Sequence, residues 1–256
     1  MDMQRNTVDS CLIMNVNVGV APVTMSWSNA VQKKKAAPST IVVEGNIGSG
    51  KSSLLRRLDG AVLRGGSDAG SSPRNVVTFQ EPVESWTHLL ELAEGDRKRW
   101  SFTLQMAVIA GLLDREKTIS AFASEASKDN VVVVLERDIQ SGHAFMEVGK
   151  NNGDLTDLEY DLGKSMIARH KQVHLADVMV YLYCGPKMCL ARIKSRGRAG
   201  EQGLSLAYLE DLDAALTATI GTRSSQTKCL VLNTETLSPD QVLSAVVEGI
   251  EHALYN

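Results

Sequence analysis

The hydrophobic residues of this chain gather in short β-rich runs separated by segments with helical patterns of apolar residues. The run 131–135 has four consecutive valines and a leucine, as expected of a strand covered on both faces. Strands that alternate with helices predict an α/β fold with a doubly wound parallel sheet and helices on both faces. The five predicted strands are 41–43, 76–79, 131–135, 178–183 and 230–232.

Helices are expected between these runs, and the last begins at Ser238-Pro239, a capping residue followed by proline at the first helical position. Glycine, serine, asparagine and proline predict two long surface loops, at 60–73 and 148–154. No internal repeat and no interdomain linker is visible. We therefore expect a flexible N-terminal extension at 1–39 and one domain at 40–256. The predicted helices are 86–92, 100–124, 155–171, 186–194, 206–218 and 239–254.

Composition limits the class of protein without naming it. The 256 residues suffice for one domain, and 43% hydrophobic and 22% charged residues are ordinary for a globular protein. A net charge of −3 does not suggest a surface that wraps nucleic acid. Four cysteines without CxxC spacing favour reduced intracellular thiols, and no apolar run is long enough to span a membrane. We expect a cytoplasmic location. The acidic N-terminal segment argues against a mitochondrial transit peptide, which stays the alternative.

The segment 45–52 fits the pattern G-x-x-x-x-G-K-[ST], with a predicted strand before it and a helix start after it. Backbone N–H groups of such a loop cradle phosphates, Lys51 would reach the β- and γ-phosphates, and the Ser52 hydroxyl would help to hold Mg²⁺. A chance glycine turn is the alternative. The pattern predicts binding of a nucleoside triphosphate by Gly45, Asn46, Ile47, Gly48, Ser49, Gly50, Lys51, Ser52 and Ser53.

Carboxylates follow two predicted strands at the edge where open α/β sheets bind ligands. Glu81 follows the second strand and could accept a proton from an attacking hydroxyl. Glu136 follows the third strand, where an acid that coordinates Mg²⁺ is expected, and Arg137 is next to it. The alternatives are a helix-capping role for Glu81 and an internal ion pair for Glu136 and Arg137.

Arg192, Arg196 and Arg198 follow the fourth strand and its helix, beside Gly197 and Gly200. Arginines in a glycine-containing segment suit a lid, at about 192–203, that closes over phosphates and neutralises charge in the transition state. A solvated basic helix end is the alternative. No aromatic residues interleave these arginines, which argues against nucleic-acid binding.

Taken in order, the motifs of this chain resemble those of the deoxynucleoside kinases, a family that includes mitochondrial thymidine kinase, deoxycytidine kinase and the insect multisubstrate enzyme. The resemblance begins at about residue 39 and runs to the C-terminus, and outside the glycine loop no single motif is specific. The motifs are the segment 44–52, Glu81-Pro82-Val83 with Trp86, Trp100-Ser101-Phe102-Thr103-Leu104-Gln105, Glu136-Arg137, Arg196-Gly197-Arg198, Glu201-Gln202-Gly203 and Tyr208-Leu209-Glu210.

The resemblance implies a P-loop kinase fold with an arginine-rich lid, ATP and Mg²⁺ as donor and cofactor, and a homodimer formed through the long helices. It implies that Glu81 is the catalytic base for the substrate 5′-hydroxyl, that Arg137 lies near the 5′ position and that Glu136 is the acid linked to Mg²⁺. Arg192 would lie near adenine, and Arg196 and Arg198 near phosphates.

The resemblance also implies a substrate pocket. Trp86 would form an aromatic wall, Gln105 would recognise the base through paired hydrogen bonds, and Glu201 would contact the sugar 3′-hydroxyl. The residue types suit these roles, because a glutamine amide offers a donor and an acceptor and an indole offers a flat apolar face. Each tryptophan taken alone would more often be a core residue.

The chain departs from the family pattern at several positions. Glu94 takes the place of a tyrosine that shares the 3′-hydroxyl with the lid acid, and Asp138 takes the place of a serine. Leu112 and Gly142 replace an arginine and an aspartate that line a polar base pocket. We therefore expect an apolar, roomy pocket that prefers thymidine, accepts deoxycytidine and binds purines poorly.

The favoured function is ATP-dependent phosphorylation of a deoxynucleoside to its 5′-monophosphate. The alternatives are a nucleoside monophosphate kinase of the thymidylate kinase type and a purine-preferring deoxynucleoside kinase; a viral origin is also left open by the divergent pocket. Acid at Glu81 and Glu84 argues against a second phosphate on the acceptor. A regulatory GTPase would need Asn-Lys-x-Asp, which is absent, and retention of Lys51, Glu81 and Glu136 argues against an inactive binding module.

Overall fold

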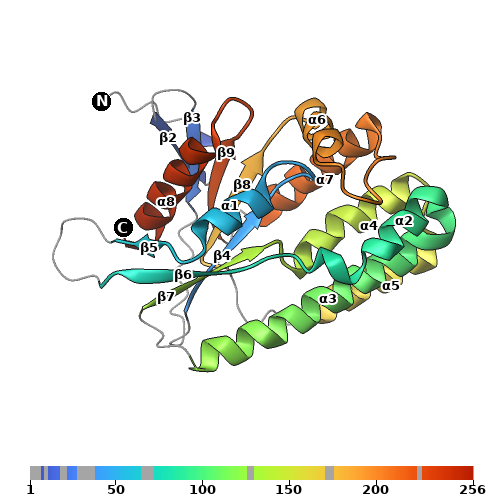
Figure 1. The fold of residues 1–256 in the computed structure, drawn as a ribbon, viewed down its shortest axis with the longest axis horizontal. Helices are drawn as coiled ribbons and strands as arrows, with labels where there is room; N and C mark the ends of the chain where they lie inside the picture. The colour runs from blue at the N-terminus through green and yellow to red at the C-terminus, as the bar shows by residue number, and fades with distance from the viewer. Residues whose placement is uncertain are drawn as a thin grey trace.

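A mixed sheet runs through the molecule, and its five central strands are parallel (Figure 1). The structure is a computed structural model that describes residues 38–64, 72–125, 130–170, 176–223 and 227–255, and the backbone of 7–8, 11–17 and 22–27. The doubly wound parallel sheet is confirmed. In spatial order its central strands are β9 (Lys228–Asn233), β8 (Val178–Tyr183), β4 (Ser39–Glu44), β7 (Val131–Glu136) and β6 (Arg74–Phe79).

Antiparallel strands extend this sheet at both edges. β5 (Val62–Leu63) pairs with β6, so the predicted number of five strands is wrong, and the described residues between 38 and 255 contain six. Two residues are too few for a periodic pattern, which is why the sequence did not reveal β5 within the predicted loop. At the other edge lie β1 (Thr7–Val8), β2 (Cys11–Asn17) and β3 (Pro22–Trp27), and β3 pairs antiparallel with β9.

Helices cover both faces of the sheet. α1 (Lys51–Leu58) and α8 (Pro239–Tyr255) pack on one face, where Ile41 and Val43 of β4 point. Val42 points to the opposite face and packs with α3, because successive side chains of a strand alternate between faces. The remaining helices are α2 (Thr87–Gly95), α3 (Arg97–Glu125), α4 (Gly142–Asn151), α5 (Asp157–Arg169), α6 (Pro186–Arg196) and α7 (Leu206–Arg223).

One helix was missed by the sequence analysis. α4 begins at Gly142 and ends at Asn151, so the first four positions of the predicted loop 148–154 belong to its last turn. The glycine and asparagine there favoured a loop, yet Gly149 permits contact with Leu155, whose Cδ1 lies 3.0 Å from the position that a Cβ would occupy. In the part of the chain that the structure describes, no helix has both the length and the apolar character needed to cross a bilayer.

Candidate active site

The P-loop joins β4 to α1 at the carboxyl edge of the sheet. Gly48 and Gly50 have positive φ angles of 84° and 104°, which residues with a Cβ rarely adopt. Lys51 Nζ turns back over the loop and donates hydrogen bonds to the carbonyl oxygens of Gly45 at 3.1 Å and Asn46 at 2.9 Å. This geometry places the ammonium group against the loop, where a bound phosphate would lie.

The environment of Lys51 changes its acidity. The pKa of Lys51 is lowered from 10.5 to about 8, mainly by burial and also by the nearby Arg137, whereas Glu136, Glu81 and Glu44 act in the opposite direction. Desolvation disfavours the charged ammonium because water no longer surrounds it. A bound polyphosphate would add negative charge and so favour the charged ammonium.

The first turn of α1 touches the end of β7. The Ser52 hydroxyl donates a hydrogen bond to Glu136 Oε1 at 2.7 Å. A hydroxyl and a carboxylate fit Mg²⁺, which is usually held by one or two protein oxygens together with waters and substrate phosphates. Among the described residues no cluster of three or more His, Cys, Asp or Glu side chains could hold a metal ion.

Arg137 joins the predicted base to the P-loop. Its Nε lies 3.4 Å from Glu81 Oε2, its Nη1 lies 3.2 Å from Glu44 Oε2, and its Nη2 donates to the Gly45 carbonyl oxygen at 3.0 Å. The side chain is only 3% exposed, and it lies over the Phe145 ring with its Cζ 4.9 Å from the centroid. Arg137 therefore joins Glu81, Glu44 and the P-loop into one connected set.

Glu44 is a further buried acid in this set. Its carboxylate accepts hydrogen bonds from Arg137 and from the Ser141 hydroxyl. Burial raises the pKa of Glu44, and Arg137 opposes that rise. The sequence analysis placed Glu44 in a motif without giving it a role. The structure shows that it supports the Arg137 guanidinium from the side opposite Glu81.

Asp138, the residue that replaces the family's serine, has a structural partner. It is 1% exposed and forms an ion pair with Arg223 of α7. Its carboxylate also accepts a hydrogen bond from the Gln140 N–H at 2.9 Å, which caps the short 3₁₀ helix that precedes α4. Asp138 thus connects the end of β7 with α7 and with the 3₁₀ helix before α4. It does not line the cavity.

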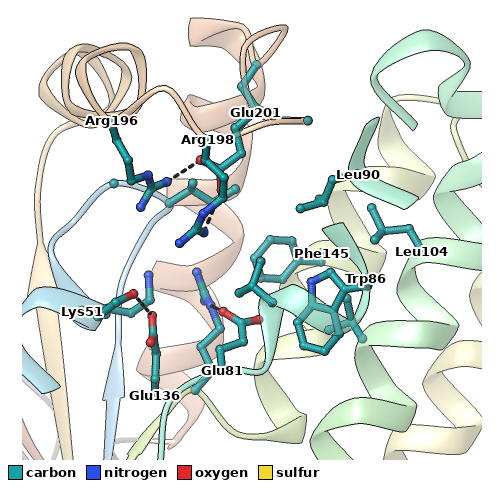
Figure 2. A pocket seen from close by; sticks show the side chains of 18 of the residues that line it. Lys51, Glu81, Trp86, Leu90, Leu104, Glu136, Phe145, Arg196, Arg198 and Glu201 are labelled. Atoms are coloured by element: carbon teal, nitrogen blue, oxygen red, sulfur yellow. Dashed lines mark hydrogen bonds and ion pairs between the residues drawn. The ribbon is translucent and has the colours of Figure 1, made fainter. Parts of the chain in front are cut away.

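One cavity of about 540 Å³ connects the P-loop with an apolar pocket between α2, α3 and α4. Figure 2 shows Lys51 and Glu136 on one side, the Trp86 ring on the other, and Glu81 between them. The cavity brings together most of the predicted site. Its lining includes Ile47, Gly48, Gly50, Lys51, Ser52, Ser53, Glu81, Trp86, Gln105, Glu136, Arg137, Arg192, Arg196, Arg198 and Glu201.

Trp86 lies at the apolar end of this cavity because α3 has a glycine behind it. A Cβ on Gly111 would lie 2.6 Å from Trp86 Cζ3, so no larger residue fits there without moving the indole. Leu104, Val108 and Phe145 complete the apolar wall, and Gln105 adds the amide. Gly111 was missed by the sequence analysis, since a glycine inside a helical pattern gives no sign of its tertiary neighbour.

The lid arginines are paired with a lid acid. Glu201 is 6% exposed, and its two oxygens contact Arg196 and, at 3.1 Å, Arg198 (Figure 2). Gly197 ends α6 in the left-handed conformation with φ 67°. Gly200 lies against α2, where a Cβ would be 2.5 Å from the Leu90 Cβ. In this structure Glu201 contacts the arginines that the resemblance assigned to phosphates.

Arg192 lies deeper than the other two arginines. Its Nη2 donates to the Thr234 carbonyl oxygen at 2.8 Å, and its Nη1 donates to the Ser49 carbonyl oxygen at 3.4 Å and to Cys184 Sγ at 3.3 Å. The side chain therefore links α6 to the P-loop and to the ends of β8 and β9. It still borders the cavity on the P-loop side.

Leu112 and Gly142 are not brought into the cavity. Leu112 is 1% exposed within the helical layer, and a Cβ on Gly142 would lie 3.0 Å from Ile167 Cδ1. The room that we expected beside Gly142 is therefore occupied by Ile167 of α5. A one-to-one alignment with the family pattern could not reveal this, because the filling side chain comes from a distant helix.

Arg97 and Tyr208 are two cavity residues near the lid to which the sequence analysis gave no role. Arg97, in the first turn of α3, lies with its Cζ 4.8 Å from the centroid of the Tyr208 ring, and both side chains line the cavity. Glu94 is exposed and also lines the cavity, with its Oε1 2.7 Å from the position of a Cβ on Gly203. Arg97 thus adds a cation to the end of the cavity that Glu94 borders.

A glycine loop with Lys51 and Ser52, an acid at the end of β7 and an arginine lid define a P-loop phosphotransferase. Comparison with known proteins gives the family: the deoxynucleoside kinase family model matches residues 41–253, and the chain belongs to that family. Deoxynucleoside kinases are phosphotransferases that use ATP or another nucleotide as the phosphate donor.

Individual relatives agree with the family assignment. A protein of Frog virus 3 (isolate Goorha) whose name places it among the deoxynucleoside kinases is 32% identical over 181 residues, which are 70% of this chain and 82% of the relative. Mitochondrial thymidine kinase 2 of Homo sapiens is 30% identical over 194 residues, which are 72% of this chain and 65% of the human protein.

A solved structure shares the fold. Deoxyadenosine kinase from M. mycoides with bound dCTP superposes with a TM-score of 0.66 and 18% identity, covering 83% of this chain and 99% of that chain. At this identity the likeness supports the fold and not the substrate.

Proposed function

We propose that the protein transfers the γ-phosphate of ATP to the 5′-hydroxyl of a deoxynucleoside. The observation that carries this proposal is the position of Glu81, which lies between the P-loop half and the apolar half of one cavity and contacts Arg137 Nε at 3.4 Å. A carboxylate at that junction is within reach of a hydroxyl whose base occupies the Trp86 pocket.

The residues divide the reaction as follows. The P-loop N–H groups and Lys51 bind the donor phosphates, and Ser52 and Glu136 would hold Mg²⁺, which neutralises phosphate charge when it is bound. Glu81 accepts the proton of the 5′-hydroxyl as the oxygen attacks the γ-phosphorus. Arg137 orients Glu81 and offers positive charge to the transferring group.

The lid completes the site when it closes. Arg196 and Arg198 leave their ion pairs with Glu201 and bind the phosphates of the donor. The Glu201 carboxylate is then free to contact the sugar. Arg192 fixes the P-loop side of α6 through Ser49 and Thr234 and borders the donor nucleotide.

For the acceptor we propose thymidine as the preferred substrate, with deoxycytidine accepted. Gln105 presents both a donor and an acceptor to a base, and the wall beside it is hydrocarbon from Leu104, Val108 and Phe145. Leu112 and Gly142, which stand at the positions of the family's polar pair, lie outside the cavity, so neither position adds a polar side chain for purine groups. A polar base edge without a partner costs more than a lost methyl contact.

A purine-preferring enzyme is the second candidate, because the curated relatives include deoxyguanosine kinase of Xenopus laevis at 27% identity. Product analysis separates the candidates. ATP and Mg²⁺ are incubated with each of the four deoxynucleosides and with thymidylate, and the products are resolved by chromatography. We expect thymidine monophosphate as the main product. A purine monophosphate as the main product would favour the second candidate, and conversion of thymidylate alone would identify a nucleoside monophosphate kinase.

We further propose a homodimer. Leu158, Leu162 and Met166 are 79%, 49% and 39% exposed and form an apolar stripe along α5, opposite the face on which Tyr160 and Ile167 are buried. Such a stripe of large apolar side chains is typical of a contact surface. Light scattering of the purified chain tests this, and Leu162→Glu is expected to shift a dimer to the monomer.

The cytoplasm stays our proposal for the cellular location, although macaque and human relatives are named as mitochondrial. Imaging of the full chain with a C-terminal fluorescent tag tests it, and co-localisation with a mitochondrial marker would contradict it.

A further inference from the structure

Arg115 lies on α3 with its guanidinium enclosed between two strand ends. The residue is 8% exposed. Its Nη1 donates to the carbonyl oxygen of Glu136 at 2.6 Å and to that of Gln80 at 3.3 Å, and its Nη2 donates to the carbonyl oxygen of Arg137 at 2.6 Å. One side chain thus binds main-chain oxygens at the ends of both β6 and β7.

These three carbonyls belong to the backbone that carries the proposed chemistry. Gln80 directly precedes Glu81, and Glu136 and Arg137 are themselves site residues. The Arg115 hydrogen bonds therefore set the spacing between the peptide that leads to Glu81 and the peptide that bears Arg137.

Arg137 needs such support because its backbone is strained. Its φ angle is 59°, the one positive φ among the non-glycine residues that the structure describes. A non-glycine residue in this left-handed region is strained, because its Cβ lies too close to the following carbonyl oxygen. The Arg137 N–H is held by the Val43 carbonyl oxygen at 3.0 Å, and its C=O is held by Arg115. Both peptide groups of the strained residue are thus fixed, one by β4 and the other by α3.

We propose that Arg115 is a positioning residue for phosphoryl transfer, which fixes the ends of β6 and β7 at the spacing where the Glu81 carboxylate and the Arg137 guanidinium meet. The proposal rests on the proposed function, in which these two residues act at the 5′-hydroxyl. Arg115 itself does not line the cavity and acts only through the backbone.

A role in general folding explains the arrangement less well. Within the described residues no carboxylate forms an ion pair with Arg115, and its buried Nε has no hydrogen-bond partner. Burial lowers the pKa of Arg115, and Glu81 is the strongest of the charges that oppose this shift. An incompletely paired buried cation is expensive, and hydrocarbon would stabilise the layer as well or better. A guanidinium group is planar and carries several N–H donors, so it can bind three carbonyl oxygens that point to one place.

The test compares Arg115→Lys and Arg115→Ala with Lys117→Ala, a matched control that removes a cation from the exposed face of the same helix. For each variant kcat and KM are measured with the best deoxynucleoside, together with thermal unfolding. Displacement of reacting groups by about 1 Å can cost ~10²-fold in rate. We expect kcat to fall by ~10²-fold in both Arg115 variants, with KM for the nucleoside changed less than ~3-fold.

Chemical rescue provides a readout that a folding role would not move. Guanidinium ion at low concentration should bind in the space left by Arg115→Ala and restore kcat at least ~10-fold, because it can donate to the same carbonyls. Under the same conditions it should leave kcat of Lys117→Ala unchanged. Unchanged kcat in Arg115→Lys, or a loss of activity that only follows the loss of folded protein, would overturn the proposal. An unmodified chain that phosphorylates no deoxynucleoside would instead refute the proposed function, and the Arg115 proposal with it.

Discussion

The Ser52 hydroxyl donates a hydrogen bond to Glu136 Oε1 over 2.7 Å, and this contact joins the first turn of α1 to the last residue of β7. The two oxygens come from segments far apart in the chain. They meet because the parallel register pairs Val43 of β4 with Glu136 of β7 and so brings both strand ends to the same edge. A hydroxyl and a carboxylate at this point suit Mg²⁺ bound to a triphosphate.

Ser52→Ala should weaken the binding of Mg²⁺. We expect the Mg²⁺ concentration for half-maximal activity to rise ~10–100-fold, as for other lost partners of a metal site. The measurement is a Mg²⁺ titration at fixed ATP after treatment with EDTA. Ser124→Ala, at an exposed hydroxyl on α3, is the control. An unaltered Mg²⁺ titration of the Ser52 variant would show that the metal is held elsewhere.

The pKa of Lys51 predicts a limit to activity at high pH. Burial lowers this pKa to about 8, so the fraction of charged ammonium decreases as the pH rises through about 8, and binding of the ATP phosphates weakens with it. We therefore expect kcat/KM for ATP to fall above pH 8. Bound phosphate favours the charged form, so kcat at saturating ATP should fall at a higher pH. Lys51→Arg keeps its charge at this pH, so this variant should have a lower kcat but should not show the decrease of kcat/KM above pH 8.

Glu81→Gln keeps the size of the side chain and removes its ability to accept a proton. We expect kcat to fall ~10²–10⁴-fold, with little change in nucleoside binding, because the proton is transferred only in the transition state. Steady-state kinetics and tryptophan fluorescence titration measure the two effects. Glu84→Gln, an exposed acid in the same segment, is the control. A raised KM with normal kcat would make Glu81 a binding residue.

Gly111→Ala should damage the base pocket. The added methyl would lie 2.6 Å from Trp86 Cζ3, so the indole must move toward the cavity or the helices must separate. Overpacking of this kind costs about 1–3 kcal/mol, and we expect KM for the nucleoside to rise ~10-fold with KM for ATP unchanged. Gly95→Ala, where no atom lies within 4 Å, is the matched control. Equal kinetics for both variants would mean that Trp86 does not form the base pocket.

The sequence predicted those parts of the molecule whose physical requirements are local. A buried parallel strand needs a continuous apolar run, and a phosphate loop needs glycines and a lysine at fixed spacing, so β4, β7 and the P-loop could be located before the structure was known. Glu81 and Glu136 followed from their places at strand ends, because parallel strands bring these ends together.

Features that depend on partners from distant segments could not be predicted. Arg115 lies inside the predicted helix 100–124, and its three carbonyl acceptors become neighbours only when β6 and β7 pack on α3. The same reason explains Gly142, whose vacant side-chain position is filled by Ile167, and the positive φ of Arg137. A local sequence pattern of a few residues cannot predict any of these contacts or this backbone conformation.

The last prediction concerns the choice of sugar. Glu201 is buried and satisfied by Arg196 and Arg198, so the lid can close on a triphosphate only if these ion pairs open. A buried carboxylate that loses its cations needs a new donor, and a sugar 3′-hydroxyl supplies one. Loss of a hydrogen bond to a charged group costs about 1.5–3 kcal/mol, or ~10–100-fold.

Glu201→Gln should therefore reduce the preference for thymidine over 2′,3′-dideoxythymidine by ~10-fold or more, measured as the ratio of their kcat/KM values. Glu94 is the competing acid, since it borders the same end of the cavity. It is exposed, and two carboxylates close together would repel, so we expect Glu94→Gln to change the ratio less than ~3-fold. If Glu94→Gln abolishes the preference and Glu201→Gln preserves it, then Glu94 binds the 3′-hydroxyl and Glu201 serves only to hold the lid arginines.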